Sequence, residues 1–397
     1  MRRDRDSRNA RSGLSRIDAV TLRSETPQKP DHHRVYLVSN SAGAGDLTRT
    51  TQAVVPGRPI RKLEPRVRAG LDVARAAAAI YVVLHHAVSL PEPFGVLLSF
   101  GQEAVLVFFL LSGFVIFANE RARVNRPKGY YLRRLRRIYP PMLVAMVVST
   151  LLWSMGLITA DFSWESLLGT LLAMQDIAFL KPGVITEPYL GNDPLWSLSY
   201  EIAFYLLFPL VMVGWRRSVM ATRWLVPAVS IVALGSYLVV PNHFSLVLAY
   251  LMMWWAGAMA AHLYLSDSLR FRNALPELVG LVLLGLVAAG GVVLHGYHGL
   301  GFFPFLIFRH YAVVLILVIL VLTPVRRWLA AGSAMIAGPA VAVASISYGL
   351  YLVHYPILVQ TGANQSWWFV PAVAAAVGCA WAADRWIPSL LPRAPRT

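Results

Sequence analysis

Long apolar stretches alternate with short polar segments from Leu71 almost to the end of the chain. Each stretch has roughly the 20 residues that a helix needs to cross a bilayer. Inside lipid such a segment must be helical, because only a helix satisfies its own backbone groups. The pattern predicts an all-α membrane protein with about ten transmembrane helices in one bundle. The expected spans are residues 71–90, 97–118, 138–158, 195–214, 224–240, 245–265, 276–295, 302–323, 335–361 and 367–387.

Residues 1–68 have a different pattern, without a sustained apolar period. They are rich in Arg, Ser, Thr, Asp and Pro, which is typical of a disordered basic arm, and they lack the apolar core of a signal peptide. The predicted organisation is this cytoplasmic arm followed by a transmembrane domain over residues 69–390. Only 14% of the chain is charged, against about 25% in soluble domains, which also favours a membrane protein.

The net charge of +16 could indicate nucleic-acid binding, but the basic residues follow the membrane topology instead. If the N-terminus is cytoplasmic, the outer loops hold one basic residue, Lys181, and the inner loops hold fifteen. This asymmetry follows the positive-inside rule and predicts a multi-pass plasma-membrane protein with both termini cytoplasmic. No nucleic-acid partner is needed to explain the charge. The inner-loop residues are Arg121, Arg123, Arg126, Lys128, Arg133, Arg134, Arg136, Arg137, Arg216, Arg217, Arg223, Arg270, Arg272, Arg326 and Arg327.

The longest outer loop, residues 159–194, is acidic and aromatic. A loop of this kind could meet a sugar-like acceptor, or it could be a lid packed over the bundle. Its acidic residues are Asp161, Glu165, Asp176, Glu187 and Asp193.

Ionisable side chains inside the expected spans are candidates for function, because each costs roughly 2.5–3.5 kcal/mol to insert. Arg75 and His86 are eleven residues apart, so on a helix they differ by only roughly 20° and share one face, about 16 Å apart along the axis. His85 points about 100° away from His86. Asp72, one turn before Arg75, could pair with it. His86 could equally be a structural histidine in a packed bundle. Further ionisable residues in the spans include Glu201, Arg309, His310 and His354, with Glu103 near the outer end of the second span.

The basic stretch "YYLRRLRRIYPP" places Arg133, Arg134 and Arg137 three and four residues apart, so their guanidinium groups can lie on one side of a helix. Guanidinium binds phosphate in a bidentate way. The alternative is that these arginines only mark the inner leaflet.

Two polar stripes occur in later spans. Ser197, Glu201 and Tyr205 follow one another at intervals of four residues, and Ser347, Tyr351 and His354 form a similar stripe. Glu201 needs a partner inside the bundle, and a buried arginine or histidine is the expected one.

Taken together, these stretches resemble the acyltransferase-3 family of integral membrane acyltransferases. The segments "LDVARAAAAIYVVLHH", "FFLLSGFVIF", "RRLRRIYP", "LWSLSYEIAFYLLFP" and "SYGLYLVHYP" occur in the order typical of that family and cover residues from about 71 to 387. Two features depart from the family pattern. Leu106 stands where an acidic residue is usual, with Glu103 one turn earlier, and the first helix is unusually rich in alanine.

The resemblance implies an activity and the residues that carry it. Members of the family transfer acyl groups, often acetyl, onto extracytoplasmic polysaccharides and other hydroxyl-bearing acceptors. Here acyl-CoA would be the cytoplasmic donor, acetyl-CoA by default, with no permanently bound cofactor and no metal. His86, Arg75 and Glu201 are the implied catalytic residues, with His86 as general base or as a transient acyl carrier. Arg133, Arg134 and Arg137 would bind the donor.

Two other classes of function remain open from the residues alone. A transporter or flippase would use the buried Arg, His and Glu side chains as a proton relay, although the broken helices and repeats of many transporters are not evident. A structural or sensor membrane protein would leave the shared Arg75–His86 face without a role.

Overall fold

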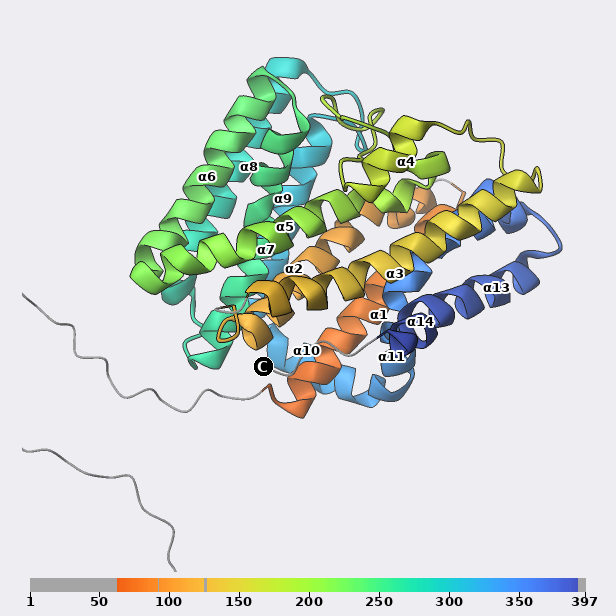
Figure 1. The fold of residues 1–397 in the computed structure, drawn as a ribbon. Coiled ribbons are helices and arrows are strands. Elements are labelled where there is room, and N and C mark those ends of the chain that lie inside the picture. The colour runs from red at the N-terminus through yellow and green to blue at the C-terminus, as the bar shows by residue number, and fades with distance from the viewer. Residues whose placement is uncertain (1–62, 92, 125–126, 392–397) are drawn as a thin grey trace, which may run out of the picture. The chain divides into compact units, whose positions relative to one another are not determined.

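The computed structural model describes residues 63–91, 93–124 and 127–391, so residues 1–62 of the predicted arm lie outside the described part. Within these ranges the chain is helical, and its one β-bridge, between Gln175 and Thr186, is isolated (Figure 1). The all-α prediction is therefore confirmed. The helices are α1 (Pro65–Ala87), α2 (Gly101–Glu120), α3 (Pro127–Ser154), α4 (Trp164–Leu171), α5 (Trp196–Arg217), α6 (Val219–Val239), α7 (His243–Leu265), α8 (Leu275–His295), α9 (Phe305–Leu322), α10 (Val325–Met335), α11 (Ala337–Ala344), α12 (Ser347–His354), α13 (Phe369–Trp381) and α14 (Ile387–Leu390).

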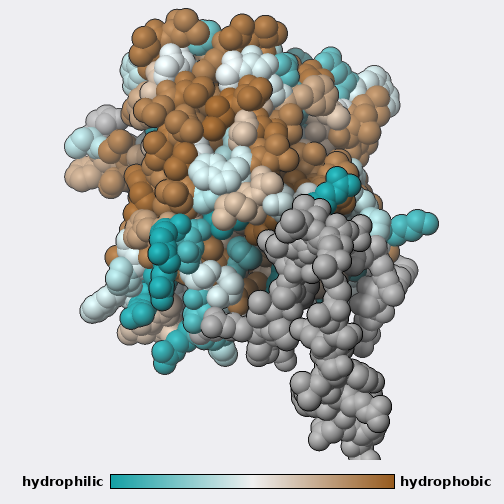
Figure 2. All heavy atoms as spheres, turned by 90° about the vertical axis from the view of Figure 1, so that its left-hand side faces the viewer, coloured by the Kyte–Doolittle hydropathy of each residue, from teal (hydrophilic) through white to brown (hydrophobic). Residues whose placement is uncertain are grey.

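Seven of the described helices, α2, α3 and α5 to α9, are long and apolar enough to cross a bilayer, and α10 with α11 makes eight if that bent pair is one span. The chain is thus a multi-pass membrane protein, and the predicted count of ten is approximate. The surface of the helix bundle is also consistent with a membrane protein. Figure 2 shows a broad apolar area on the side where α6 and α8 lie, with hydrophilic side chains below it. Val232 and Val239 of α6 and Leu286 and Val293 of α8 are exposed there, as lipid-facing side chains would be.

The expected span 335–361 is not one helix. α10 and α11 meet at an angle of 87°, a second break separates α11 from α12, and α12 continues as π-helical turns over Tyr355–Gln360. Gly338 and Pro339 follow the first break, and Pro356, which lacks a backbone N–H, lies in the π-helical turns. The apolar composition predicted a membrane segment here, but the composition does not show where the backbone turns.

The core forms around α7, which is buried along most of its length, and α2 lies along it. Their backbones approach closely at two glycines. A Cβ atom at Gly113 would lie 2.0 Å from the Trp254 carbonyl oxygen, and one at Gly257 would lie 2.0 Å from the Leu110 carbonyl oxygen. Small residues permit this approach of two membrane helices. The contact fixes α2, whose other face carries residues of the site described below.

The loop between α4 and α5, which is expected to lie outside the cell, packs onto the bundle. The Phe303 N–H donates to the Leu180 carbonyl (3.0 Å), and the Tyr237 hydroxyl donates to the Pro182 carbonyl (2.8 Å). Lys181, the single basic residue of the expected outer loops, is fully buried and ion-paired with Asp176 at 2.7 Å. Burial lowers the pKa of its ammonium group, and the Asp176 carboxylate opposes that shift. Lys181 is therefore an anchor of the loop rather than an exposed charge.

Candidate active site

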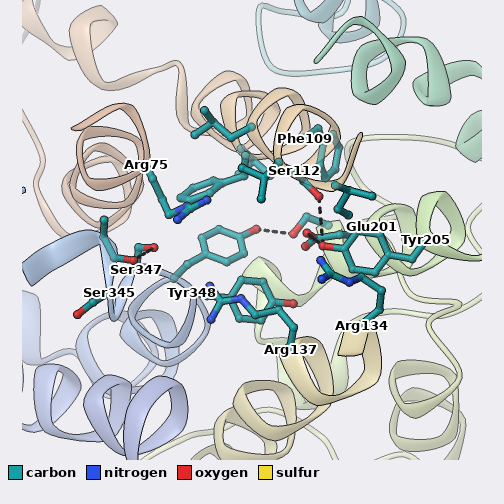
Figure 3. Close-up of a pocket in the computed structure, with 18 of the residues that line it drawn as sticks. Arg75, Phe109, Ser112, Arg134, Arg137, Glu201, Tyr205, Ser345, Ser347 and Tyr348 are labelled. Atoms are coloured by element: carbon teal, nitrogen blue, oxygen red, sulfur yellow. Dashed lines mark hydrogen bonds between the residues drawn. The ribbon is translucent and has the colours of Figure 1, made fainter. Parts of the chain in front are cut away.

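A cavity of about 460 Å³ lies among α1, α2, α3, α5 and the segment from α11 to α12 (Figure 3). Four arginines line it, Arg75 from α1 and Arg133, Arg134 and Arg137 from α3, together with Glu201 from α5. The rest of the cavity lining consists of hydroxyl-bearing and apolar side chains. The hydroxyl-bearing residues are Ser112, Ser197, Tyr205, Ser345, Ser347, Tyr348 and Tyr351.

Glu120, the last residue of α2, orients two of the α3 arginines. Its buried carboxylate accepts two hydrogen bonds from Arg133, at 2.9 and 2.6 Å, and one from Arg134 at 3.3 Å. The bidentate pair uses Nε and Nη2 of Arg133. Arg133 is thus largely committed to Glu120, whereas Arg134 retains donors for another partner.

Arg137 is held from the opposite end of the chain. Its guanidinium donates to Asp384 (3.2 Å) and lies 5.3 Å from the centroid of the Tyr348 ring. Asp384 is buried and also accepts a hydrogen bond from the Gly349 N–H at 2.7 Å. This carboxylate therefore ties α3 to α12 beside the cavity.

Two buried polar atoms that belong to cavity-lining residues have no hydrogen-bond partner among the described residues. They are Nε of Arg134 and the hydroxyl oxygen of Tyr348. Buried polar groups in proteins are nearly always paired, so such atoms need an explanation, and a bound polar ligand is one. Arg75 is less constrained, because its one ion pair, with Asp72, is long at 3.7 Å.

Glu201 has a hydroxyl partner instead of the expected cation. The Tyr205 hydroxyl donates to Glu201 and lies 3.1 Å from Ser112 Oγ, and no described arginine or histidine forms an ion pair with Glu201 (Figure 3). The expected cations lie further away: Arg134 and Arg137 line the same cavity and interact with Glu201 electrostatically, without a direct ion pair. The two polar stripes do meet, because Ser197 Oγ lies 3.0 Å from the Tyr351 hydroxyl.

His86 lies outside the cavity lining, against a second histidine. Its Nδ1 is 3.2 Å from Nε2 of His354 and 3.1 Å from the Val82 carbonyl oxygen. His354 Nδ1 faces the Leu350 carbonyl at 3.1 Å, and a carbonyl can only accept, so this nitrogen carries the proton and Nε2 of His354 is an acceptor. Both atoms that face His86 Nδ1, the Val82 carbonyl oxygen and Nε2 of His354, are therefore acceptors, so Nδ1 of His86 carries a proton as well. The lone pair of His86 is left on Nε2, to which no described residue hydrogen-bonds.

His85 has a different environment. Its Nδ1 bonds to the Leu98 carbonyl, and its ring packs against the start of α2, where a Cβ at Gly101 would lie 2.1 Å from it. The two rings differ in their hydrogen-bond partners, although they are in contact, with centroids 4.5 Å apart. Beyond His86, the Tyr355 ring lies 5.1 Å away, and its hydroxyl donates to Asp193 at 3.1 Å.

The family model of the acyltransferase domain matches residues 68–385, which include the whole cavity and both histidines. The chain belongs to the acyltransferase-3 family. The resemblance seen in the sequence motifs is confirmed.

Three similar relatives of this acyltransferase-3 member share only part of their length with it. Nodulation protein 10 of Rhizobium leguminosarum bv. viciae is 28% identical over 46% of this chain and 53% of its own length. Acyltransferase MdmB of Streptomyces mycarofaciens is 37% identical over 30% of this chain and 29% of its own. A putative O-acetyltransferase of Staphylococcus aureus (strain MSSA476) is 28% identical over 37% of this chain and 25% of its own. The chain thus aligns with about half or less of each relative. No solved structure matches it.

Within this acyltransferase-3 fold, five of the six predicted site residues converge on one cavity: Arg75, Arg133, Arg134, Arg137 and Glu201. The sixth, His86, lies beyond it. The sequence interpretation missed Glu120 and Asp384, the carboxylates that hold the arginines. The sequence did hold a signal for each of them. Glu120 is a carboxylate just after the expected span 97–118, and Asp384 is a carboxylate near the end of the expected span 367–387.

Glu103 does not replace the acidic residue that the family often has at position 106. It pairs with Arg309 at 2.6 Å, near His310, and it does not line the cavity. Leu106 is fully buried in the core. Among the described residues, no group of three His, Cys, Asp or Glu side chains is placed to hold a metal ion.

Proposed function

We propose that this chain is a membrane O-acyltransferase. It would move an acyl group from cytoplasmic acyl-CoA, acetyl-CoA as the expected donor, to a hydroxyl group of an extracytoplasmic acceptor such as a surface polysaccharide. The observation that carries the proposal is the arginine-lined cavity with two unpaired buried polar atoms, next to a histidine whose Nε2 is free. Two relatives are named as an acyltransferase and a putative O-acetyltransferase, which supports this class of reaction.

The donor would bind in the cavity as a polyanion. Coenzyme A carries phosphate groups, and a planar guanidinium grips phosphate with two parallel hydrogen bonds. Arg134 is the best placed of the α3 arginines, since its Nε is unpaired and Arg133 is already engaged by Glu120. The thioester end would point away from the arginines, toward Tyr351 and the histidine pair.

His86 would act as the general base. Its Nε2 takes the proton of the acceptor hydroxyl as that oxygen attacks the thioester carbonyl. The tetrahedral intermediate then collapses, the C–S bond breaks, and the proton passes from His86 to the leaving coenzyme A thiolate. His354 would be a positioning residue, because its Nε2 and the Val82 carbonyl both accept from Nδ1 of His86 and so keep the lone pair of His86 on Nε2.

The test is acyl transfer by the full-length protein in its membrane. Membranes that contain the wild-type chain are expected to release free coenzyme A from acetyl-CoA, and acyl esters are expected on surface glycans by mass spectrometry. His86→Ala should abolish both signals at an equal level of protein in the membrane. Equal coenzyme A release by the wild type and His86→Ala would contradict the proposal, and a transporter would give no release at all.

A further inference from the structure

Two aromatic rings of the cavity lining lie near the histidine pair. Phe108 of α2 and Tyr351 of α12 both line the cavity, with ring centroids 5.9 Å apart. Tyr351 also contacts His354, with ring centroids 6.4 Å apart, and His354 contacts His86. The ring pair thus links the cavity lining to His86 through contacts of Tyr351 with His354 and of His354 with His86.

The two rings differ in how firmly they are held. Tyr351 is buried, and its hydroxyl donates to the Pro194 carbonyl at 2.7 Å and lies 3.0 Å from Ser197 Oγ. Phe108 is half-buried, and its side chain has no polar atom that could form a hydrogen bond. Tyr351 is thus the fixed wall of the passage, and Phe108 is the side chain whose size sets the remaining space.

We infer that Phe108, facing the fixed ring of Tyr351, limits this enzyme to short acyl chains. The inference rests on the proposed function, because it assumes an acyl-CoA in the cavity. A thioester that reaches the histidine pair must place its acyl group at the ring pair, and each added methylene then needs space that the two rings occupy. A close-packed pocket typically discriminates by about tenfold or more between two substrates that differ by one methylene group.

The experiment measures binding, so it does not depend on the identity of the acceptor. The full-length chain in lipid nanodiscs is titrated with coenzyme A, acetyl-CoA and hexanoyl-CoA. For the wild type we expect hexanoyl-CoA to bind at least about tenfold more weakly than acetyl-CoA. In Phe108→Ala this ratio should fall to within about threefold, because the removed ring leaves room for the longer chain.

Phe114→Ala is the matched control. Phe114 lies on the same helix, is also half-buried and loses the same atoms, but it contacts Tyr264 (ring centroids 6.3 Å apart) and does not line the cavity. This variant should keep the wild-type ratio. If Phe108→Ala does not fold, Phe108→Leu removes less volume and should still lower the ratio.

The outcomes separate the two proposals. A wild type that binds hexanoyl-CoA as tightly as acetyl-CoA, or an unchanged ratio in the Phe108 variants, would overturn the chain-length inference and leave the donor site standing. If the wild type binds none of the three compounds, coenzyme A included, the proposed function fails and the chain-length inference fails with it.

Discussion

At the scale of single residues, the two adjacent histidines are expected to have separate roles. His86→Ala should abolish coenzyme A release, because the proposed base is lost, while acetyl-CoA binding stays within about threefold since His86 lies outside the cavity. His85→Asn should retain most activity, because its amide nitrogen can replace Nδ1 in the bond to the Leu98 carbonyl. Turnover and binding are measured on both variants at matched membrane levels. Equal loss in the two variants would contradict the assignment.

His354 is expected to act through His86 and not on the donor. His354→Ala should lower kcat with little change in the KM for acetyl-CoA, because Nδ1 of His86 loses one of its two acceptors and the ring is held only by the Val82 carbonyl. His354→Gln should restore part of the rate, since its amide oxygen can accept the same hydrogen bond. Steady-state kinetics on the two variants checks this. A rise in KM without a fall in kcat would instead place His354 at the donor site.

Arg133 and Arg134 are neighbours with different partners, so their variants should differ. Arg134→Ala should raise the apparent dissociation constant of coenzyme A roughly ten- to hundredfold, the usual cost of one lost charge-assisted hydrogen bond. Arg134→Lys should restore only part of the affinity, because it keeps the charge without the planar fork.

Arg133→Ala should mainly lower the melting temperature, because it leaves the buried Glu120 with one partner. Both variants are titrated with coenzyme A and then melted. If Arg134→Ala leaves the dissociation constant of coenzyme A unchanged and only reduces the amount of protein in the membrane, the α3 arginines are topology markers.

Helical phase along single spans was enough to predict part of the site. It grouped the α3 arginines, which line the cavity together with Arg75, but His86 lies outside the lining and its ring contacts that of His85. It could not find Glu120 as the partner of Arg133 or Asp384 as the partner of Arg137, because these contacts join residues 13 and 247 positions apart in the chain. Such contacts depend on how helices pack, which no local period encodes.

At the scale of helices, long apolar stretches predicted α2, α3 and α5 to α9 well, because lipid requires each of them to be helical. The segment 335–361 was predicted less well. Its composition is apolar throughout, and although Gly338, Pro339 and Pro356 lie at or near the irregular turns, they do not predict the 87° bend between α10 and α11 or the π-helical turns after His354. One of these irregular segments matters to the site, because Tyr355 at the first π-helical position lies beside His86.

The contact between α2 and α7 gives a prediction for helix packing. Gly257→Ala should destabilise the protein by about 3 kcal/mol, because the new Cβ would lie 2.0 Å from the Leu110 carbonyl oxygen and α2 would have to move. Gly235→Ala on α6 is the matched control, since a Cβ there meets nothing within 4 Å. Melting temperatures in detergent measure both. A Gly257→Ala protein as stable as the control would show that α2 and α7 can separate without cost.

At the scale of the whole molecule, the buried ion pair of Lys181 sharpens the charge asymmetry. Because Asp176 neutralises Lys181, the one basic residue of the expected outer loops contributes no free charge there, and the basic residues at the opposite end are the topological signal. The proposed reaction needs this orientation, since it places the arginine-lined cavity within reach of a cytoplasmic donor.

The orientation can be measured with introduced cysteines. Cys379 is the single native cysteine, so a Cys379→Ser background is free of thiols. Asp161→Cys in the loop before α4 should react with a membrane-impermeant maleimide in intact cells. Arg217→Cys at the end of α5 and Arg270→Cys before α8 should react only after permeabilisation, although all three positions are exposed on the protein surface. Labelling of Arg217→Cys in intact cells would place the basic end outside, where no acyl-CoA is available, and the donor would then have to be a different polyanion.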